Sequence, residues 1–190
     1  MRKVLPILLL TVALTTACNS RQHQAEKLAQ EAAMKQLGID EGYEADETTL
    51  DSVFGPEEDT AVMDEAQVLV RLNAMCEEVS QLKNASQSEA ESNQYASLID
   101  SIVNTAVGYS IDFMRRLEKP REFVGFRVRQ HYSCTQNDST SHGTMVVYLD
   151  KEMSRATRVF ELPAWEAVMR SVAASKESSD AIDKAAQQNK

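Results

Sequence analysis

The sequence predicts an α+β fold in which an antiparallel helical hairpin packs on a three- to four-stranded antiparallel sheet. Two long segments carry apolar residues every three or four positions, and a stretch of alternating apolar and polar residues follows them. Runs of helices followed by runs of strands are typical of α+β proteins. With 190 residues, the chain is long enough for one domain of this kind with its own core.

The first segment, residues 1–17, reads as an export signal. Two basic residues precede the apolar run Val4–Leu14, which is shorter than the roughly 20 residues that a membrane-spanning helix needs. Cys18 follows small residues in a pattern that resembles the bacterial lipobox, with Thr15 where the lipobox usually has Leu, Val or Ile. The resemblance implies cleavage before Cys18 and lipid on its sulfur. The alternative is an ordinary secretory signal with a chance cysteine nearby.

The charge balance restricts the partners. Asp and Glu outnumber Lys and Arg by 29 to 20, and no basic stripe is present, so nucleic acid is not an expected partner. An acidic chain is also repelled by anionic lipid head groups, so membrane attachment is expected through lipid on Cys18. We expect an outer-membrane location facing the periplasm rather than the cell surface, an envelope protein or glycan as partner, and no cofactor.

The segment 18–58 is predicted to hold a helix and then an acidic stretch. Residues 19–37 are good helix formers with a thin apolar stripe, so this helix is either a spacer or a weakly docked element. The stretch 39–60 is rich in Asp and Glu and contains Tyr43–Val53, which is either an edge strand or part of a solvated linker.

The segment 59–174 is predicted to form the α+β domain. One helix begins at Asp59 or Thr60 and keeps its apolar stripe to Leu82, and a second runs to Leu117. A short polar connection between them indicates an antiparallel hairpin.

Period-two alternation then indicates strands and a closing helix. The polar residues Thr135–Gly143 are predicted to form a loop, Pro163 to begin a short helix, and 175–190 to be a polar tail. The predicted strands are Val124–Cys134, Thr144–Leu149 and Ala156–Leu162.

Two segments, together with the lipobox, resemble a group of small uncharacterised lipoproteins of Bacteroidota-type bacteria. The chain departs from the group's pattern at Gly42, Ala45 and Asp46 and lacks its frequent Asn-x-x-Gly turn. The resemblance implies an envelope location and pairing of the Tyr43 segment with the sheet, and it brings no catalytic residues. The matching segments are Gly42-Tyr43-Glu44…Thr48…Asp51-Ser52-Val53-Phe54-Gly55-Pro56 and Phe123-Val124-Gly125-Phe126-Arg127-Val128…His131-Tyr132.

Cys76 and Cys134 both fall on predicted core faces, one on the hairpin and one on the sheet. A disulfide between them would close a long loop and stabilise the fold by roughly 2–4 kcal/mol. The alternative is two buried free thiols.

Arg127, Arg129 and His131 form a cationic row on one face of the predicted strand. This row either pairs with carboxylates on the neighbouring strand or binds an anionic glycan or partner. A metal site built from His131, Cys134 and His142 is not expected, because Cys134 lies on the opposite face and ligands must converge on one ion.

Four Asp-Ser/Thr triplets resemble the O-glycosylation signal of the same phylum, and Ser139 and Thr60 are the accessible candidates. The alternative is that these residues are ordinary caps and loops. No phosphate loop, nucleophile elbow or other catalytic motif is found. The leading hypothesis is a non-enzymatic binding or structural module. The alternatives are an envelope hydrolase with spatially assembled carboxylates and an inhibitor of a secreted enzyme.

Overall fold

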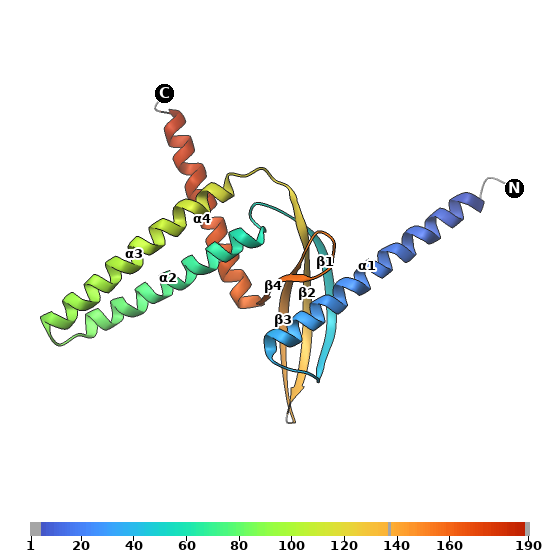
Figure 1. Ribbon diagram of the computed structural model, residues 1–190, viewed down its shortest axis with the longest axis horizontal. Coiled ribbons are helices and arrows are strands. Elements are labelled where there is room, and N and C mark those ends of the chain that lie inside the picture. The colour runs from blue at the N-terminus through green and yellow to red at the C-terminus, as the bar shows by residue number, and fades with distance from the viewer. Residues whose placement is uncertain (1–4, 137, 189–190) are drawn as a thin grey trace. The chain divides into compact units, whose positions relative to one another are not determined.

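The computed structural model describes residues 5–136 and 138–188, and it describes side chains over 20–136 and 138–177. The described residues form helices and a four-stranded antiparallel sheet, so the predicted α+β class is confirmed (Figure 1). The elements are α1 (Leu5–Leu37), β1 (Tyr43–Phe54), α2 (Thr60–Ala85), α3 (Glu89–Leu117), β2 (Phe123–Gln136), β3 (Ser139–Leu149), β4 (Ala156–Glu161) and α4 (Leu162–Gln188).

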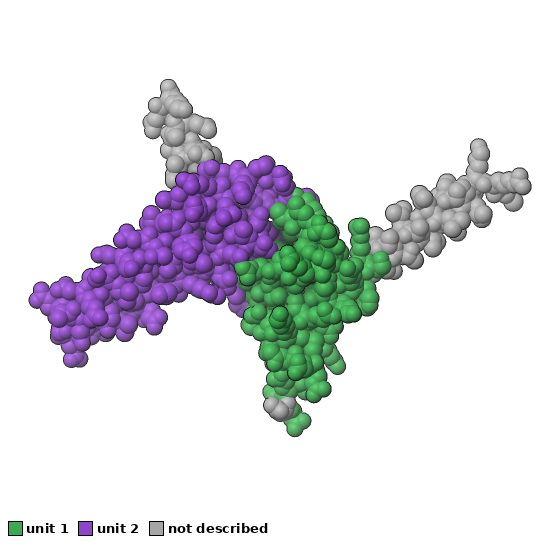
Figure 2. Space-filling model, viewed as in Figure 1, with its two compact units in different colours: residues 1–53, 123–162 green, residues 54–122, 163–190 purple. Residues whose placement is uncertain are grey.

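The chain divides into two compact units, each made of two separate segments (Figure 2). Unit 1 comprises residues 1–53 and 123–162 and holds the sheet with α1, whereas unit 2 comprises residues 54–122 and 163–190 and holds α2, α3 and α4. This division differs from the predicted boundary near residue 58. β1, which precedes that boundary, belongs to the same unit as the rest of the sheet, and α4 belongs to the same unit as the hairpin.

The sheet of unit 1 has the order β1-β2-β3-β4. β2 and β3 stay paired as far as Gln136 and Ser139, so the predicted polar loop Thr135–Gly143 is mostly strand. Asp138, just before β3, takes the left-handed φ of 62° that suits a tight connection. Polar alternation on an exposed hairpin resembles a loop in sequence, which is why the strand ends were placed too early.

β1 is the edge strand, which is the first of the two alternatives for the acidic stretch. Thr135 donates its backbone N–H to the carbonyl of Gly42 at 2.9 Å, just before β1 begins. Gly42 has φ +79°, and a Cβ there would lie 2.3 Å from the Thr135 carbonyl oxygen. The start of the strand therefore requires glycine.

Helix α1 packs on one face of this sheet and forms the core of unit 1 with it. Its inward positions are Ala25, Ala29 and Ala33, all fully buried, whose small side chains let the helix approach the strands closely. The helical hairpin was expected to cover the sheet, but within unit 1 the helix that covers it is α1. The sheet residues of this core include Val128, Tyr132, Cys134, Met145, Val147 and Leu149.

In unit 2, the predicted helical hairpin is present. α2 begins after Asp59, whose carboxylate accepts the Ala61 N–H at 2.8 Å, and α3 begins after Ser88, whose hydroxyl accepts the Glu91 N–H at 3.2 Å. The two helices pack along each other. Pro163 lies in the first turn of α4, which is longer than the short helix that the sequence predicted.

Candidate functional site

The predicted signal and the lipidation residue Cys18 lie outside the residues whose side chains are described. Within the described part of the chain, no helix combines the length and the apolar character needed to cross a membrane. Attachment through Cys18 therefore stays a prediction.

The cationic row is held within the sheet. Arg127 donates to the Asp51 carboxylate of β1 at 2.9 Å, and its side chain is only 19% exposed. His131 Nδ1 lies 2.8 Å from the hydroxyl of Thr144 on β3. Arg129 is half-buried on the same face. Arg127 therefore pairs with a carboxylate on the neighbouring strand, which is the first of the two alternatives for this row.

Cys76 and Cys134 are both free thiols, one in each unit. Cys134 is buried in the core between α1 and the sheet, whereas Cys76 is half-buried on α2. Both thiols are free in the structure, as in the second alternative, but Cys76 is half-buried rather than buried. The sequence placed both cysteines on core-facing positions, but it did not indicate that they belong to different units.

The two glycosylation candidates differ in access. Ser139 is exposed at the start of β3 and pairs with Gln136, so it lies in a strand rather than in the predicted loop. Thr60 is half-buried at the first position of α2, next to the capping Asp59.

A buried polar cluster, which the sequence analysis missed, links β1 to β2. The Tyr43 hydroxyl donates to Gln130 Oε1 at 2.7 Å, and Gln130 Nε2 donates to the Thr48 hydroxyl at 3.2 Å. Tyr43 also stacks on Tyr132 with ring centroids 5.0 Å apart. Gln130 is 1% exposed, so both of its polar atoms are satisfied where water is excluded. This cluster ties the edge strand β1 to its neighbour β2.

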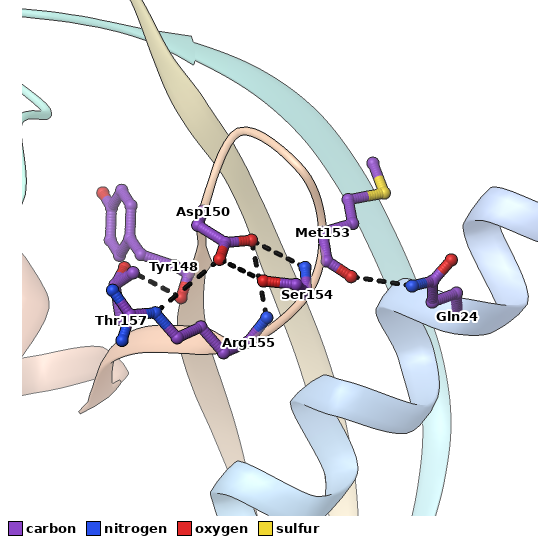
Figure 3. Close-up of polar contacts among 7 residues, drawn as sticks. All are labelled: Gln24, Tyr148, Asp150, Met153, Ser154, Arg155 and Thr157. Atoms are coloured by element: carbon purple, nitrogen blue, oxygen red, sulfur yellow. Dashed lines mark hydrogen bonds and ion pairs between the residues drawn. The ribbon is translucent and has the colours of Figure 1, made fainter.

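The β3–β4 connection is a second polar cluster (Figure 3). The two Asp150 carboxylate oxygens accept from the Ser154 N–H at 2.6 Å and the Ser154 hydroxyl at 2.5 Å. The bond from the Ser154 hydroxyl is the main reason that the pKa of Asp150 is lowered. Met153 offers its carbonyl to Gln24 Nε2 of α1 at 2.8 Å, so the turn also holds the covering helix (Figure 3).

Unit 2 contains an open groove of about 510 Å³ among its three helices. Aliphatic side chains of α2 and α3 supply most of its lining, and two serines of α4 close one side. Val103 and Val107, which line it, are 46% and 54% exposed, and Ile111 continues their line along α3 at 52%. The apolar lining residues include Leu69, Val70, Leu72, Cys76, Ile102, Val103 and Val107.

A second cleft of about 420 Å³ lies in the same unit where the chain enters α2 and leaves α3. Two glutamates line it, which is the feature that the hydrolase alternative requires. Burial disfavours the charged form of Glu57, but hydrogen bonding and the charge of Lys176 outweigh burial, so the pKa of Glu57 is lowered. A general acid needs the opposite shift.

Where side chains are described, no three His, Cys, Asp or Glu residues gather closely enough to hold a metal ion. His131 lies on the sheet face opposite Cys134, as the alternation predicted. His142, which the sequence placed in a loop, lies in β3 on the same face as His131. Comparisons with known protein families, with curated proteins and with solved structures find no match for this chain. Function is therefore argued from the residues themselves.

Proposed function

We propose that this protein is a lipid-anchored envelope lipoprotein that acts as a non-enzymatic binding module. Lipid on Cys18 would hold it at the outer membrane, on the periplasmic side, and the groove of unit 2 would bind a partner protein. The observation that carries the binding role is the apolar face of the helical hairpin, which is left open to solvent along α3. The support for the anchor is the lipobox-like sequence before Cys18.

The groove has the features of a site for a helix. Val103, Val107 and Ile111 are spaced four residues apart, so their side chains form one apolar ridge on α3. Apolar surface of this kind is costly to expose, and contiguous apolar patches on soluble domains mark interaction sites. An amphipathic helix places its own apolar face into such a groove with anchors at the same spacing.

The charge of the hairpin supports one kind of helix as the occupant. α2 and α3 together carry eight Asp or Glu against four Lys or Arg, and the exposed Asp100 lies one turn before Val103. A second copy of this chain would bring like charges together, which is destabilising. The occupant that we propose is therefore an amphipathic helix of another envelope protein, with Lys or Arg flanking its apolar face.

Fluorescence anisotropy with designed peptides tests this occupant. Full-length protein in neutral detergent is titrated with three labelled helical peptides: one has an apolar face with Lys flanks, one the same face with Glu flanks, and one Lys flanks with a polar face. We expect the first peptide to bind at least about tenfold more tightly than the other two. The proposal would be contradicted if the Glu-flanked peptide, or the polar-faced peptide, bound as tightly as the peptide with an apolar face and Lys flanks.

A matched pair of variants locates the binding. Val107→Gln removes an apolar groove residue and keeps helix propensity, whereas Ala74→Gln adds the same side chain at an exposed position of α2 outside the groove lining. Val107→Gln should weaken binding by about tenfold, and Ala74→Gln should leave it unchanged.

Metabolic labelling with radioactive palmitate tests the anchor separately. Wild type should incorporate label and sediment with envelopes, whereas Cys18→Ser should do neither. A Cys18→Ser variant that still takes up palmitate would contradict the anchor and leave the groove proposal unaffected.

A further inference from the structure

We propose that the free edge of β1 binds an extended segment of a partner protein, rich in Lys or Arg, which joins the sheet as a further strand. This site lies in unit 1 and does not depend on the hairpin groove of unit 2. In strand addition of this kind, backbone hydrogen bonds supply affinity and side chains supply specificity.

The outer edge of β1 has no strand beside it. β1 stands first in the sheet order, so among the described strands it pairs with β2 alone. An edge strand presents backbone N–H and C=O groups that point away from the sheet at alternate residues, and these groups can pair with an added strand. β1 is 12 residues long, and its burial pattern is mostly exposed. Proteins commonly keep edge strands short, so a long exposed edge is a template for a further strand.

The inner edge of β1 is fixed by side chains along its length. Tyr43 and Thr48 both bond the buried Gln130 of β2, and Asp51 accepts from Arg127 at 2.9 Å. These contacts hold the strand extended before any partner arrives. A preformed strand lowers the ordering cost of binding, because only the partner segment has to become ordered.

The charge of this region is strongly one-sided. Half of the residues from Asp40 to Asp51 are Asp or Glu, and the sequence has no Lys or Arg between Lys35 and Arg71. Asp51 is already paired with Arg127. Glu44, Asp46 and Glu47, by contrast, are exposed to solvent along the strand.

This charge selects among the possible occupants of the edge. Two copies of the chain that paired through β1 would place carboxylates opposite carboxylates, and like charges on facing strands are destabilising. A strand carrying Lys or Arg would place opposite charges across the new pairing, which is stabilising. The same acidic residues therefore oppose self-association and favour a cationic partner.

Fluorescence anisotropy with short capped peptides tests the charge, using the full-length protein in neutral detergent at low salt. One labelled peptide alternates Lys with Val, and a second has Glu in place of each Lys. We expect the Lys peptide to bind at least about tenfold more tightly, and its affinity to fall as salt is added. Equal binding of the two peptides would overturn the proposal.

Backbone pairing is tested separately with two methylated versions of the Lys peptide, each carrying the same number of N-methyl groups. Successive N–H groups of a strand point to opposite edges. Methyl groups on alternate residues therefore leave one edge intact, whereas methyl groups on neighbouring residues block both edges. The first version should keep most of the affinity, and the second should lose at least about tenfold. If both versions bind equally well, the attraction is electrostatic only and strand addition is wrong.

Hydrogen exchange locates the new pairing. Saturation with the Lys peptide should slow exchange by about tenfold or more at alternate amides of residues 44–52, and it should leave the amides of β4, the other edge strand, unchanged. Protection of β4 instead of β1 would contradict the assignment of the site.

Matched variants complete the test. Glu47→Gln should weaken binding of the Lys peptide by about threefold, because it removes one exposed charge from the strand. Glu152→Gln makes the same change at an exposed position in the β3–β4 connection and should have no effect, and neither should the groove variant Val107→Gln. Far-UV circular dichroism checks that each variant is folded. If Glu152→Gln weakens binding as much as Glu47→Gln, the peptide responds to net charge and the site is not β1.

Discussion

Tyr43 donates its hydroxyl to Gln130 Oε1 at 2.7 Å, which joins the edge strand to its neighbour inside unit 1. The two residues are 87 positions apart in the chain, and both are buried. Edge strands are held by one ladder of backbone bonds only, so a side-chain bond from within the core adds stability where the sheet is weakest.

Removing this hydroxyl should loosen the edge of the sheet. Tyr43→Phe keeps the ring stacked on Tyr132 but leaves Gln130 Oε1 buried without its donor, and the expected loss is about 1–3 kcal/mol. Urea unfolding and hydrogen exchange of the β1 amides measure this change. Trp165, the only tryptophan in the sequence, belongs to unit 2, and its fluorescence gives a second unfolding signal.

Stability should fall at alkaline pH because of the same residue. Burial raises the pKa of Tyr43 far above its ordinary value of 10.0, and burial also raises the pKa of Tyr132. Because the pKa is higher in the folded protein, the tyrosine hydroxyls of the unfolded chain lose their protons at lower pH. The free energy of unfolding therefore falls above about pH 10, and these two groups do not change it below that pH. Tyr43→Phe should flatten this alkaline decline. An equally steep decline in the variant would contradict the account.

Close packing of α1 on the sheet should not tolerate a larger side chain. Ala29 is fully buried against the strands, so Ala29→Leu should destabilise unit 1 by about 1–3 kcal/mol through overpacking. Ala74→Leu is the matched change at an exposed helical position and should have little effect. Thermal unfolding of both variants checks this, and equal behaviour would mean that α1 does not pack as described.

Two glycines should respond in opposite directions to alanine. Gly125 has φ +147°, and a Cβ there would lie 2.3 Å from the Leu149 carbonyl oxygen, so Gly125→Ala should cost about 1–3 kcal/mol. Gly108 lies within α3 with nothing near its Cβ position, so Gly108→Ala should stabilise unit 2 by about 0.5–1 kcal/mol. Urea unfolding, followed separately in each unit, measures both effects.

Counting reactive thiols tests the state of all three cysteines. If Cys18 carries lipid and Cys76 and Cys134 are free, the denatured, unreduced protein should take up two maleimide groups. In the native protein, Cys76 should react faster than the buried Cys134. Intact mass spectrometry gives the number directly. Three labels would mean an unmodified Cys18, and none would mean a disulfide.

The local elements could be predicted because their periodicity is strong. The hairpin helices have wide apolar stripes, Asp59 caps the first of them, and β2 alternates between buried and exposed residues. Edge strand β1 was one of two interpretations, since its acidic side chains are equally typical of a linker.

Docking of α1 on the rest of the protein was one of two interpretations, because Ala25, Ala29 and Ala33 form a weak hydrophobic signal despite complete burial. Gln130 was overlooked for a similar reason: a polar residue at a core-facing position has a role only when its partners, here Tyr43 and Thr48, are known. The cleft where the chain enters α2 and leaves α3 joins segments about 50 to 60 residues apart, so local sequence patterns do not reveal it.

The most direct test of the proposed binding role is photo-cross-linking from position 107 in intact cells. A photoreactive amino acid in place of Val107 should yield one adduct heavier than the 21.2 kDa chain, and the same amino acid at Ala74 should not. Adding Val103→Gln should abolish this adduct. Peptide mapping of the adduct should identify a Lys- or Arg-flanked amphipathic segment of another protein as the cross-linked partner. An adduct of twice the chain mass, or equal adducts from both positions, would contradict the account.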